Sequence, residues 1–163
     1  MFNVVLVEPE IPPNTGNIAR LCLATGSRLH LVRPLGFSTE DRQLRRAGMD
    51  YWEQIKVEYW DNLAEFELGF NTHLKTGQPG ERTTVRRYLF TTKADRPYWE
   101  AKYQPNDYLV FGRETKGLPE SFLNKYRESC LTIPMEPEAR SLNLATAVAV
   151  VLFEGIRQLR QNN

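Results

Sequence analysis

The stretch Tyr108-Leu-Val-Phe-Gly-Arg-Glu-Thr-Lys-Gly-Leu-Pro119 contains the pattern from which the fold of this chain can be predicted. A short apolar run, residues 108–111, is bounded by a polar loop with two glycines, and this predicts a buried strand. Pro119 suits the first position of a helix, where no backbone N–H is needed. We therefore expect a strand, a loop and a helix in succession.

Similar strand-like runs occur elsewhere, at residues 2–7, 29–32, 55–59, 88–90 and 130–133. Between them lie helical patterns at residues 14–22 (ended by Gly26), 41–47 and 63–68, a polar loop at 71–84, and a last, widely apolar helix at 143–160. Strands that alternate with helices predict an α/β fold with a mainly parallel sheet and helices on both faces. The length of 163 residues predicts one domain, 1–163.

Charge, hydrophobicity and cysteine content exclude several classes of protein. A formal net charge of +1 argues against a general polyanion binder, so any RNA site must be local. No apolar run is long enough to span a membrane, and the start of the chain does not resemble a signal peptide, which predicts a soluble, cytoplasmic protein. Cys22 and Cys130 fit buried, reduced thiols better than a disulfide or a metal site.

Ligands of parallel sheets bind beyond the carboxyl ends of the strands. This rule directs attention to the loops after residues 7, 90, 111 and 133. The loop after residue 111 carries Gly112 and Gly117, which allow close approach of a ligand, and the carboxylate of Glu114. It is not a phosphate-binding P-loop, because Leu118 and Pro119 stand where Lys and Ser or Thr are required. A tight turn before a helix would explain the loop equally well.

Two other loops carry polar groups that permit two interpretations. Asn14 and Arg20 lie on the first predicted helix, where Asn14 could be a cap and Arg20 an exposed side chain. Ser141 and Asn143 stand at the start of the last helix, where either could be a cap or could grip a polar ligand. The coincidence of three such loops at one edge of a parallel sheet favours a binding site.

These three segments resemble the three motifs of the SPOUT methyltransferases, in their SpoU branch: Asn14-Thr-Gly-Asn-Ile-Ala-Arg20, Phe111-Gly-Arg-Glu-Thr-Lys-Gly-Leu-Pro119, and Ile133-Pro-Met followed by Ser141-Leu-Asn143. Residues 8–17 and 44–51 are also similar to the TrmL subfamily of tRNA (cytidine/uridine-2′-O)-methyltransferases. The resemblance covers nearly the whole chain. It departs from the subfamily in a longer stretch at residues 71–87 and in Phe153, where relatives often carry tyrosine.

The resemblance implies a deep trefoil knot in the C-terminal part of the chain, an exception among protein folds. It implies that S-adenosylmethionine is the methyl donor and that the protein is a homodimer whose first and last helices pack across the interface. We expect no metal, because methyl transfer from a sulfonium needs no Lewis acid and the histidines His30 and His73 lack a ligand constellation. The implied acceptor is the ribose 2′-hydroxyl of the wobble nucleotide, position 34, in tRNA such as tRNA-Leu. The implied cofactor-binding residues are Phe90, Thr91, Gly112, Glu114, Gly117, Ile133, Met135, Ser141 and Leu142.

By the same resemblance, Arg20 acts on the 2′-hydroxyl. A guanidinium is a poor base, so we expect Arg20 either to orient the hydroxyl or a neighbouring phosphate, or to stabilise developing alkoxide charge. The catalytic set also includes Asn14, Glu114, Ser141 and Asn143, which we expect to shape the site. Phosphate contacts are predicted at Arg42, Arg45, Arg46 and Arg87. The alternatives are a SPOUT enzyme acting on ribosomal RNA and a noncatalytic RNA-binding module.

Overall fold

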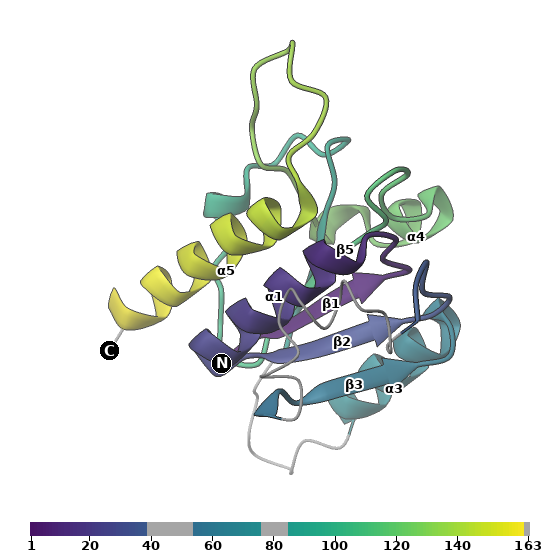
Figure 1. Cartoon of the computed structure of the whole chain (residues 1–163). Coiled ribbons are helices and arrows are strands. Elements are labelled where there is room, and N and C mark those ends of the chain that lie inside the picture. Colours follow the sequence, from purple (N-terminus) through teal and green to yellow (C-terminus); the bar gives the residue numbers. More distant parts are fainter. Residues whose placement is uncertain (39–53, 76–84, 162–163) are drawn as a thin grey trace.

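A parallel sheet forms the centre of the molecule (Figure 1). The computed structural model describes residues 1–38, 54–75 and 85–161. The strands are β1 (Asn3–Val7), β2 (Arg28–Val32), β3 (Val57–Trp60), β4 (Arg87–Phe90), β5 (Tyr108–Phe111) and β6 (Cys130–Leu131). Their order across the sheet is β3-β2-β1-β5-β4-β6, and every pair of neighbours is parallel. The predicted mainly parallel sheet is confirmed.

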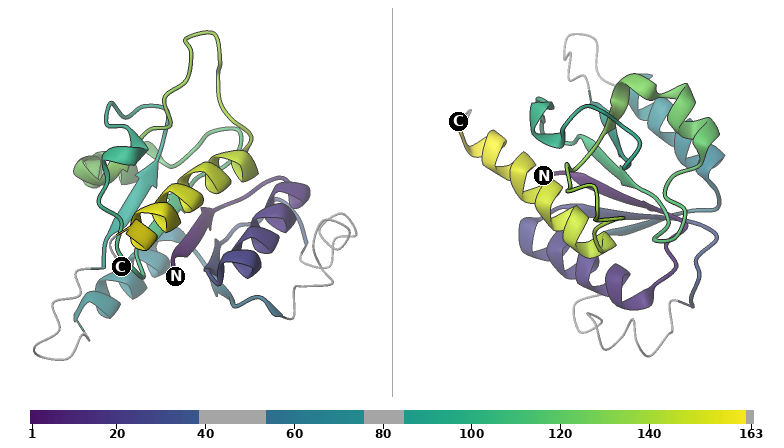
Figure 2. Two further views of the ribbon diagram at one scale, coloured as in Figure 1. Left: turned by 90° about the vertical axis from the view of Figure 1, so that its left-hand side faces the viewer. Right: turned by 90° about the horizontal axis from the view of Figure 1, so that it is seen from above.

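Helices cover both faces of the sheet, as the sequence predicted (Figure 2). On one face, Val4 and Leu6 of β1 pack in a core with α1 (Pro12–Thr25) and α5 (Leu144–Gln161). On the other face, Val5 and Val7 pack in a core with α3 (Leu63–Lys75) and α4 (Glu120–Lys125). Two single turns, η2 (Tyr98–Glu100) and η3 (Arg127–Ser129), complete the described helices. Alternate side chains of β1 therefore point into different cores.

Two predicted helix boundaries were wrong. Helix α1 begins at Pro12, after Ile11 as its N-cap, so Asn14 lies inside the first turn and does not cap the helix. Proline fits the first positions because their N–H groups have no partner within a helix. Helix α3 continues to Lys75, well past the predicted end at residue 68. Gly26 does end α1 as expected, with φ of 64°.

The remaining predictions on the fold concern the thiols, membrane spans and residues 39–53. Both cysteines are free and buried, as predicted, and burial raises the pKa of the Cys22 thiol to about 12. That thiol is therefore protonated and unreactive at neutral pH. Within the described ranges, no helix has the length and apolar character needed to cross a bilayer. The predicted helix at residues 41–47 lies outside the described residues.

Candidate active site

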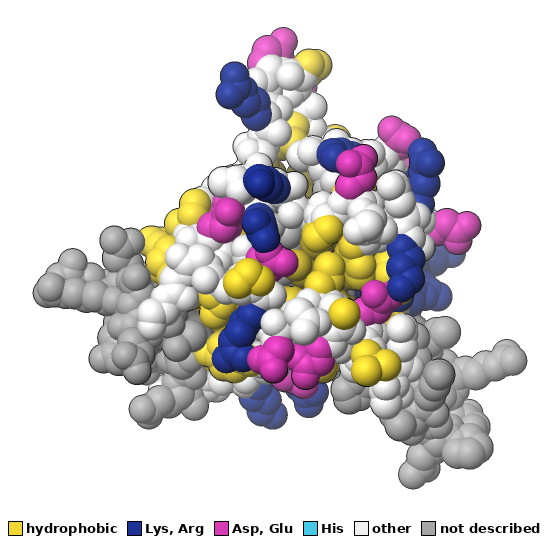
Figure 3. Space-filling model, turned by 90° about the vertical axis from the view of Figure 1, so that its right-hand side faces the viewer, with side chains coloured by type: hydrophobic (Ala, Val, Ile, Leu, Met, Phe, Trp, Pro, Cys, Tyr) yellow, Lys and Arg dark blue, Asp and Glu magenta, His cyan; other side chains and the backbone are white. Residues whose placement is uncertain are grey.

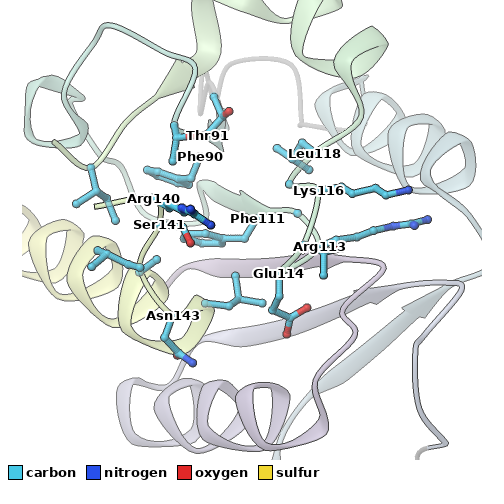
Figure 4. A pocket seen from close by; sticks show the side chains of 18 of the residues that line it. Phe90, Thr91, Phe111, Arg113, Glu114, Lys116, Leu118, Arg140, Ser141 and Asn143 are labelled. Carbon is cyan, nitrogen blue, oxygen red and sulfur yellow. The ribbon is translucent and has the colours of Figure 1, made fainter. Parts of the chain in front are cut away.

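A cavity of about 600 Å³ opens at the carboxyl ends of β4, β5 and β6 (Figure 4). Its lining comes from the three loops that follow these strands, together with the starts of α1 and α5. The nine residues predicted to bind the cofactor all line it: Phe90, Thr91, Gly112, Glu114, Gly117, Ile133, Met135, Ser141 and Leu142. A volume of this size is typical of small-molecule sites. The structure therefore brings these nine residues together.

A chain of hydrogen bonds joins three of the predicted catalytic residues. The Nδ2 group of Asn14, a buried residue, donates to Glu114 Oε1 at 3.1 Å, and Asn143 Nδ2 donates to Asn14 Oδ1 at 2.8 Å. Asn143 Oδ1 also accepts from the N–H groups of Ala145 and Thr146, at 2.9 and 3.3 Å. Asn143 is thus the cap of α5, as one of the two interpretations predicted, and it also links α5 to α1; its contact with a ligand stays a prediction.

The loop after β1 and the loop after β5 are joined by reciprocal hydrogen bonds, in which a glutamate of each loop accepts from the other loop. Glu114 accepts from the backbone N–H groups of Glu10 and Ile11, at 2.8 and 3.3 Å. In return, Glu10 accepts from the Thr115 N–H at 3.1 Å and from its hydroxyl at 2.7 Å. A salt bridge between Glu8 and Arg113 lies beside this exchange. We call the Glu10–Thr115 and Glu8–Arg113 contacts the latch; its residues were not among the predicted site residues.

Gly112 and Gly117 give the β5 loop its tight shape. A Cβ built on Gly112 would lie 2.1 Å from the carbonyl carbon of Gly117, so only glycine fits there. Gly117 has φ of 67°, a conformation that side chains disfavour, and Arg113 and Gly117 exchange backbone hydrogen bonds at 3.2 and 2.9 Å. The loop therefore folds back on itself and presents backbone groups to the cavity.

Of the two remaining predicted catalytic residues, Ser141 lines the cavity and Arg20 does not. Ser141 is exposed and lines the cavity, next to Arg140 (Figure 4). Arg20 lies on the exposed side of α1, nearly two turns beyond Asn14, and does not line the cavity of its own chain. The predicted catalytic set is therefore only partly assembled within one chain.

The structure describes only one of the four arginines that were predicted to contact RNA. Arg42, Arg45 and Arg46 lie outside the described residues. Arg87 begins β4 at the opposite, amino-terminal edge of the sheet. Its guanidinium lies over the rings of Tyr126 and Phe70, at 3.6 and 4.5 Å from their centroids. Arg87 thus has a packing role inside the chain, and its phosphate contact stays a prediction.

Sequence reasoning missed several residues of the site. Besides the latch, the cavity is lined by Lys93, Lys116 and Arg140, and none of these was singled out. A signal was available, because Glu8 and Glu10 follow a predicted strand directly, where site residues are expected. Across the described residues, no cluster of three or more potential metal-binding His, Cys, Asp or Glu side chains is found.

The latch predicts a selective effect on cofactor affinity. Glu10→Ala removes both acceptors of Thr115 and loosens the β5 loop. Charge-assisted hydrogen bonds this exposed contribute about 1 kcal/mol, so we expect S-adenosylmethionine to bind about fivefold more weakly. Turnover at saturating cofactor should change little. Calorimetric titration and initial rates would measure the two effects, with Glu128→Ala, an exposed change on η3, as the control; unchanged affinity in Glu10→Ala would contradict this role.

Comparisons with known proteins identify the family of this chain. The family model of the SpoU rRNA methylase family matches residues 1–153. The tRNA (cytidine(34)-2′-O)-methyltransferase of Escherichia coli strain K12 is 46% identical over 160 residues, which cover 98% of this chain and 94% of that protein. The corresponding protein of Yersinia pestis is 46% identical over 160 residues, with the same coverage.

A solved structure gives the same result in three dimensions. That structure concerns the 2-OH methylation of C/U34 on tRNA. It superposes on this chain with a TM-score of 0.86 and 40% sequence identity, and the match covers 99% of this chain and 97% of that one. The family model and these relatives extend over nearly all of the chain, including the residues that form the cavity. The chain therefore belongs to the SpoU rRNA methylase family.

Proposed function

We propose that this protein transfers the methyl group of S-adenosylmethionine to the ribose 2′-hydroxyl of nucleotide 34 in the tRNA anticodon loop. The observation that carries the proposal is the hydrogen-bonded chain Glu114–Asn14–Asn143 at the rim of a cavity lined by all nine expected cofactor residues. Relatives named for this reaction match nearly the whole chain, which favours C34 or U34 over a nucleotide in ribosomal RNA.

The cavity fits S-adenosylmethionine in shape and chemistry. Phe90 and Phe111 stack with 4.7 Å between ring centroids, and with Leu118 and Ile133 they form an apolar wall suited to a purine base. Gly112 lets the backbone of Gly117 and Leu118 pack directly against it, and polar groups of the other loops line the same cavity. The bound cofactor would supply an activated methyl group on a positively charged sulfur.

The remaining chemistry falls to side chains. The acceptor hydroxyl must be placed in line with the methyl group, and its proton must leave. We assign Ser141 and Asn143 to the acceptor side of the cavity, because both line it in the segment just before α5. Glu114 and Asn14 are positioning residues, since their side chains tie the cofactor loop to the first turn of α1.

Arg20 is proposed to stabilise the developing alkoxide in the cavity of a second subunit. Two observations support this assignment. Arg20 is exposed on α1, outside the cavity of its own chain, and α1 packs beside α5 on the same face of the sheet (Figures 1 and 2). A dimer that pairs these two helices would bring Arg20 of one subunit towards the other.

The homodimer itself is therefore part of the proposal. Phe153 on α5 is 53% exposed, and Trp99 on the adjoining η2 is 50% exposed. Burial of an exposed aromatic side chain stabilises a complex by about 1.5–3 kcal/mol. In a dimer with two-fold symmetry each such contact occurs twice, once from each subunit. These two side chains give α5 and η2 an apolar surface that a second copy would cover.

Phe153→Glu is predicted to convert the dimer to a monomer, because it places a charge from each subunit in a desolvated contact. Sedimentation velocity at micromolar concentration would measure the change. Phe153→Tyr, which keeps the ring, should leave the dimer intact. A wild-type monomer, or a dimeric Phe153→Glu variant, would contradict the interface.

Three further expectations complete the proposal. The chain forms one domain, 1–163, in the cytoplasm, where tRNA is found. Its C-terminal part is threaded as a trefoil knot through the segment after β4. Support for the threading comes from the hydrogen bonds of Thr132 with Tyr98 and Arg96, both at 2.8 Å, which hold the chain after β6 against that segment.

The deciding experiment is incubation of the purified protein with labelled S-adenosylmethionine and total tRNA from a strain that lacks this gene. Nuclease mapping should place the label on the 2′-O-methyl group of nucleotide 34. Label on ribosomal RNA alone would keep the chemistry and reject the substrate. No label on either RNA, with normal cofactor binding, would favour the noncatalytic RNA-binding module.

A further inference from the structure

The lining of the active-site cavity has an excess of positive charge. Four cationic side chains line it, Lys93, Arg113, Lys116 and Arg140, against one carboxylate, Glu114. Arg113 is neutralised by its salt bridge with Glu8. Glu114 is already saturated by three N–H donors, from Glu10, Ile11 and Asn14.

The other three cations are available to a ligand. Lys93, Lys116 and Arg140 are exposed, and no salt bridge or hydrogen bond of their side-chain nitrogens is found within the described part of the chain. One comes from each of the three loops after β4, β5 and β6. Three different loops at the carboxyl end of the sheet therefore contribute them to the lining, and we call them the rim cations.

The figures show how this charge is distributed. Figure 3 looks onto the side to which the strands point, and hydrophobic side chains there fill a central area with Lys, Arg, Asp and Glu side chains around it. In Figure 4, Lys116 extends away from the centre of the cavity, whereas Arg140 lies beside Ser141. The exposed Glu136 and Glu138 are on the same segment as Arg140 but do not line the cavity.

The proposed cofactor does not account for this excess. S-adenosylmethionine carries a sulfonium, an ammonium and a carboxylate near neutral pH, so it is itself a net cation. Its single carboxylate carries one negative charge, which offsets only one of these cations. The remaining cations can therefore pair with an anion that approaches from outside.

We infer that Lys93, Lys116 and Arg140 bind the phosphates on either side of the nucleotide that enters the cavity. The inference rests on the proposed function, since it assigns the RNA-contacting residues of the same site. A nucleotide inserted into a cavity brings its 5′ and 3′ phosphodiesters to the rim, where long cationic side chains can reach them. Such contacts hold the RNA in position and do not read its sequence.

The test is the salt dependence of tRNA binding to the triple variant Lys93→Ala, Lys116→Ala, Arg140→Ala. Each lost contact with single-stranded RNA should reduce the slope of log affinity against log salt by about 0.7, so three contacts predict a change of about 2. Affinity at low salt should fall on the order of tenfold or more. Filter binding with a catalytically inert cofactor product, S-adenosylhomocysteine, would measure both quantities.

A matched triple variant controls for net charge. Arg28, Lys56 and Lys102 are exposed and lie at the opposite edge of the sheet, before or at the starts of β2, β3 and β5. Their replacement by alanine removes the same charge and should leave the salt slope within about 0.5 of wild type. Equal losses in both triple variants would overturn the inference, because they would show a general charge effect.

Cofactor affinity separates the remaining outcomes. Calorimetry should give the rim variant a wild-type affinity for S-adenosylhomocysteine. If Arg140→Ala weakens that affinity tenfold and leaves tRNA binding intact, Arg140 holds the cofactor carboxylate and its phosphate role is rejected. If wild-type protein methylates tRNA but the rim variant keeps its affinity and slope, the inference fails while the proposed function stands. A wild-type protein that neither binds nor methylates tRNA rejects both.

Discussion

Gly112→Ala is expected to weaken binding of S-adenosylmethionine by roughly a hundredfold or more, and to reduce methyl transfer at limiting cofactor by a similar factor. The added Cβ would lie 2.1 Å from the carbonyl carbon of Gly117 and 2.2 Å from the Leu118 nitrogen. Both neighbours are backbone atoms of the cofactor loop, so no side chain can move aside and the loop itself must open. Overpacking of this kind costs about 3 kcal/mol, which corresponds to a loss of affinity of roughly a hundredfold or more.

Gly117→Ala provides the matched control in the same loop. A Cβ on Gly117 meets no atom within 4 Å, and its only cost is a φ of 67°. That strain is about 1–2 kcal/mol, so the control should weaken cofactor binding by much less than Gly112→Ala. Calorimetric titration compares the two, and thermal unfolding checks that both variants fold. A folded Gly112→Ala variant with normal affinity would show that the loop is not part of the cofactor site.

Arg20→Ala is expected to reduce methyl transfer by at least about a hundredfold to a thousandfold, the loss seen when a group that stabilises developing negative charge is removed. Cofactor affinity should stay largely normal, because Arg20 is assigned to the acceptor hydroxyl and does not line the cofactor cavity of its own chain. Stability should change little, since the side chain is exposed. Single-turnover rates with tRNA, alongside calorimetry, would separate these effects. Wild-type turnover in the variant would exclude Arg20 from the chemistry.

Mixed dimers decide in which cavity Arg20 acts. Arg20→Ala and Gly112→Ala are each expected to have little activity as homodimers when the cofactor is limiting. A mixed dimer has one intact cavity, in the Arg20→Ala subunit, and one intact arginine, in the other subunit. If Arg20 acts across the interface, co-refolding the two variants restores activity. If it acts within its own chain, the mixture stays inactive, because no subunit then holds both an intact cavity and an intact arginine.

The comparison of sequence and structure is clearest in α1. Its end at Gly26 could be predicted because left-handed backbone is local chemistry that glycine alone adopts easily. The start of α1 could not be predicted, because the local sequence around Asn14 is typical of a helix N-cap. In the structure the Asn14 amide instead serves Glu114 and Asn143, which are 100 and 129 residues away in the chain. A contact of such sequence separation leaves no local signal.

By itself, the sequence determined the parallel α/β sheet and the edge at which its loops meet, because apolar runs become strands and the loops after parallel strands lie at one edge. The individual residues of the cavity were expected only through the resemblance to a known family. Only the tertiary structure decided how those loops are tied together, and which cations remain for a ligand. It paired Glu10 with Thr115 and Glu8 with Arg113, and it left Lys116 and Arg140 at the rim. The availability of a charged group depends on whether the fold brings an opposite charge to it, and residue type alone does not contain that information.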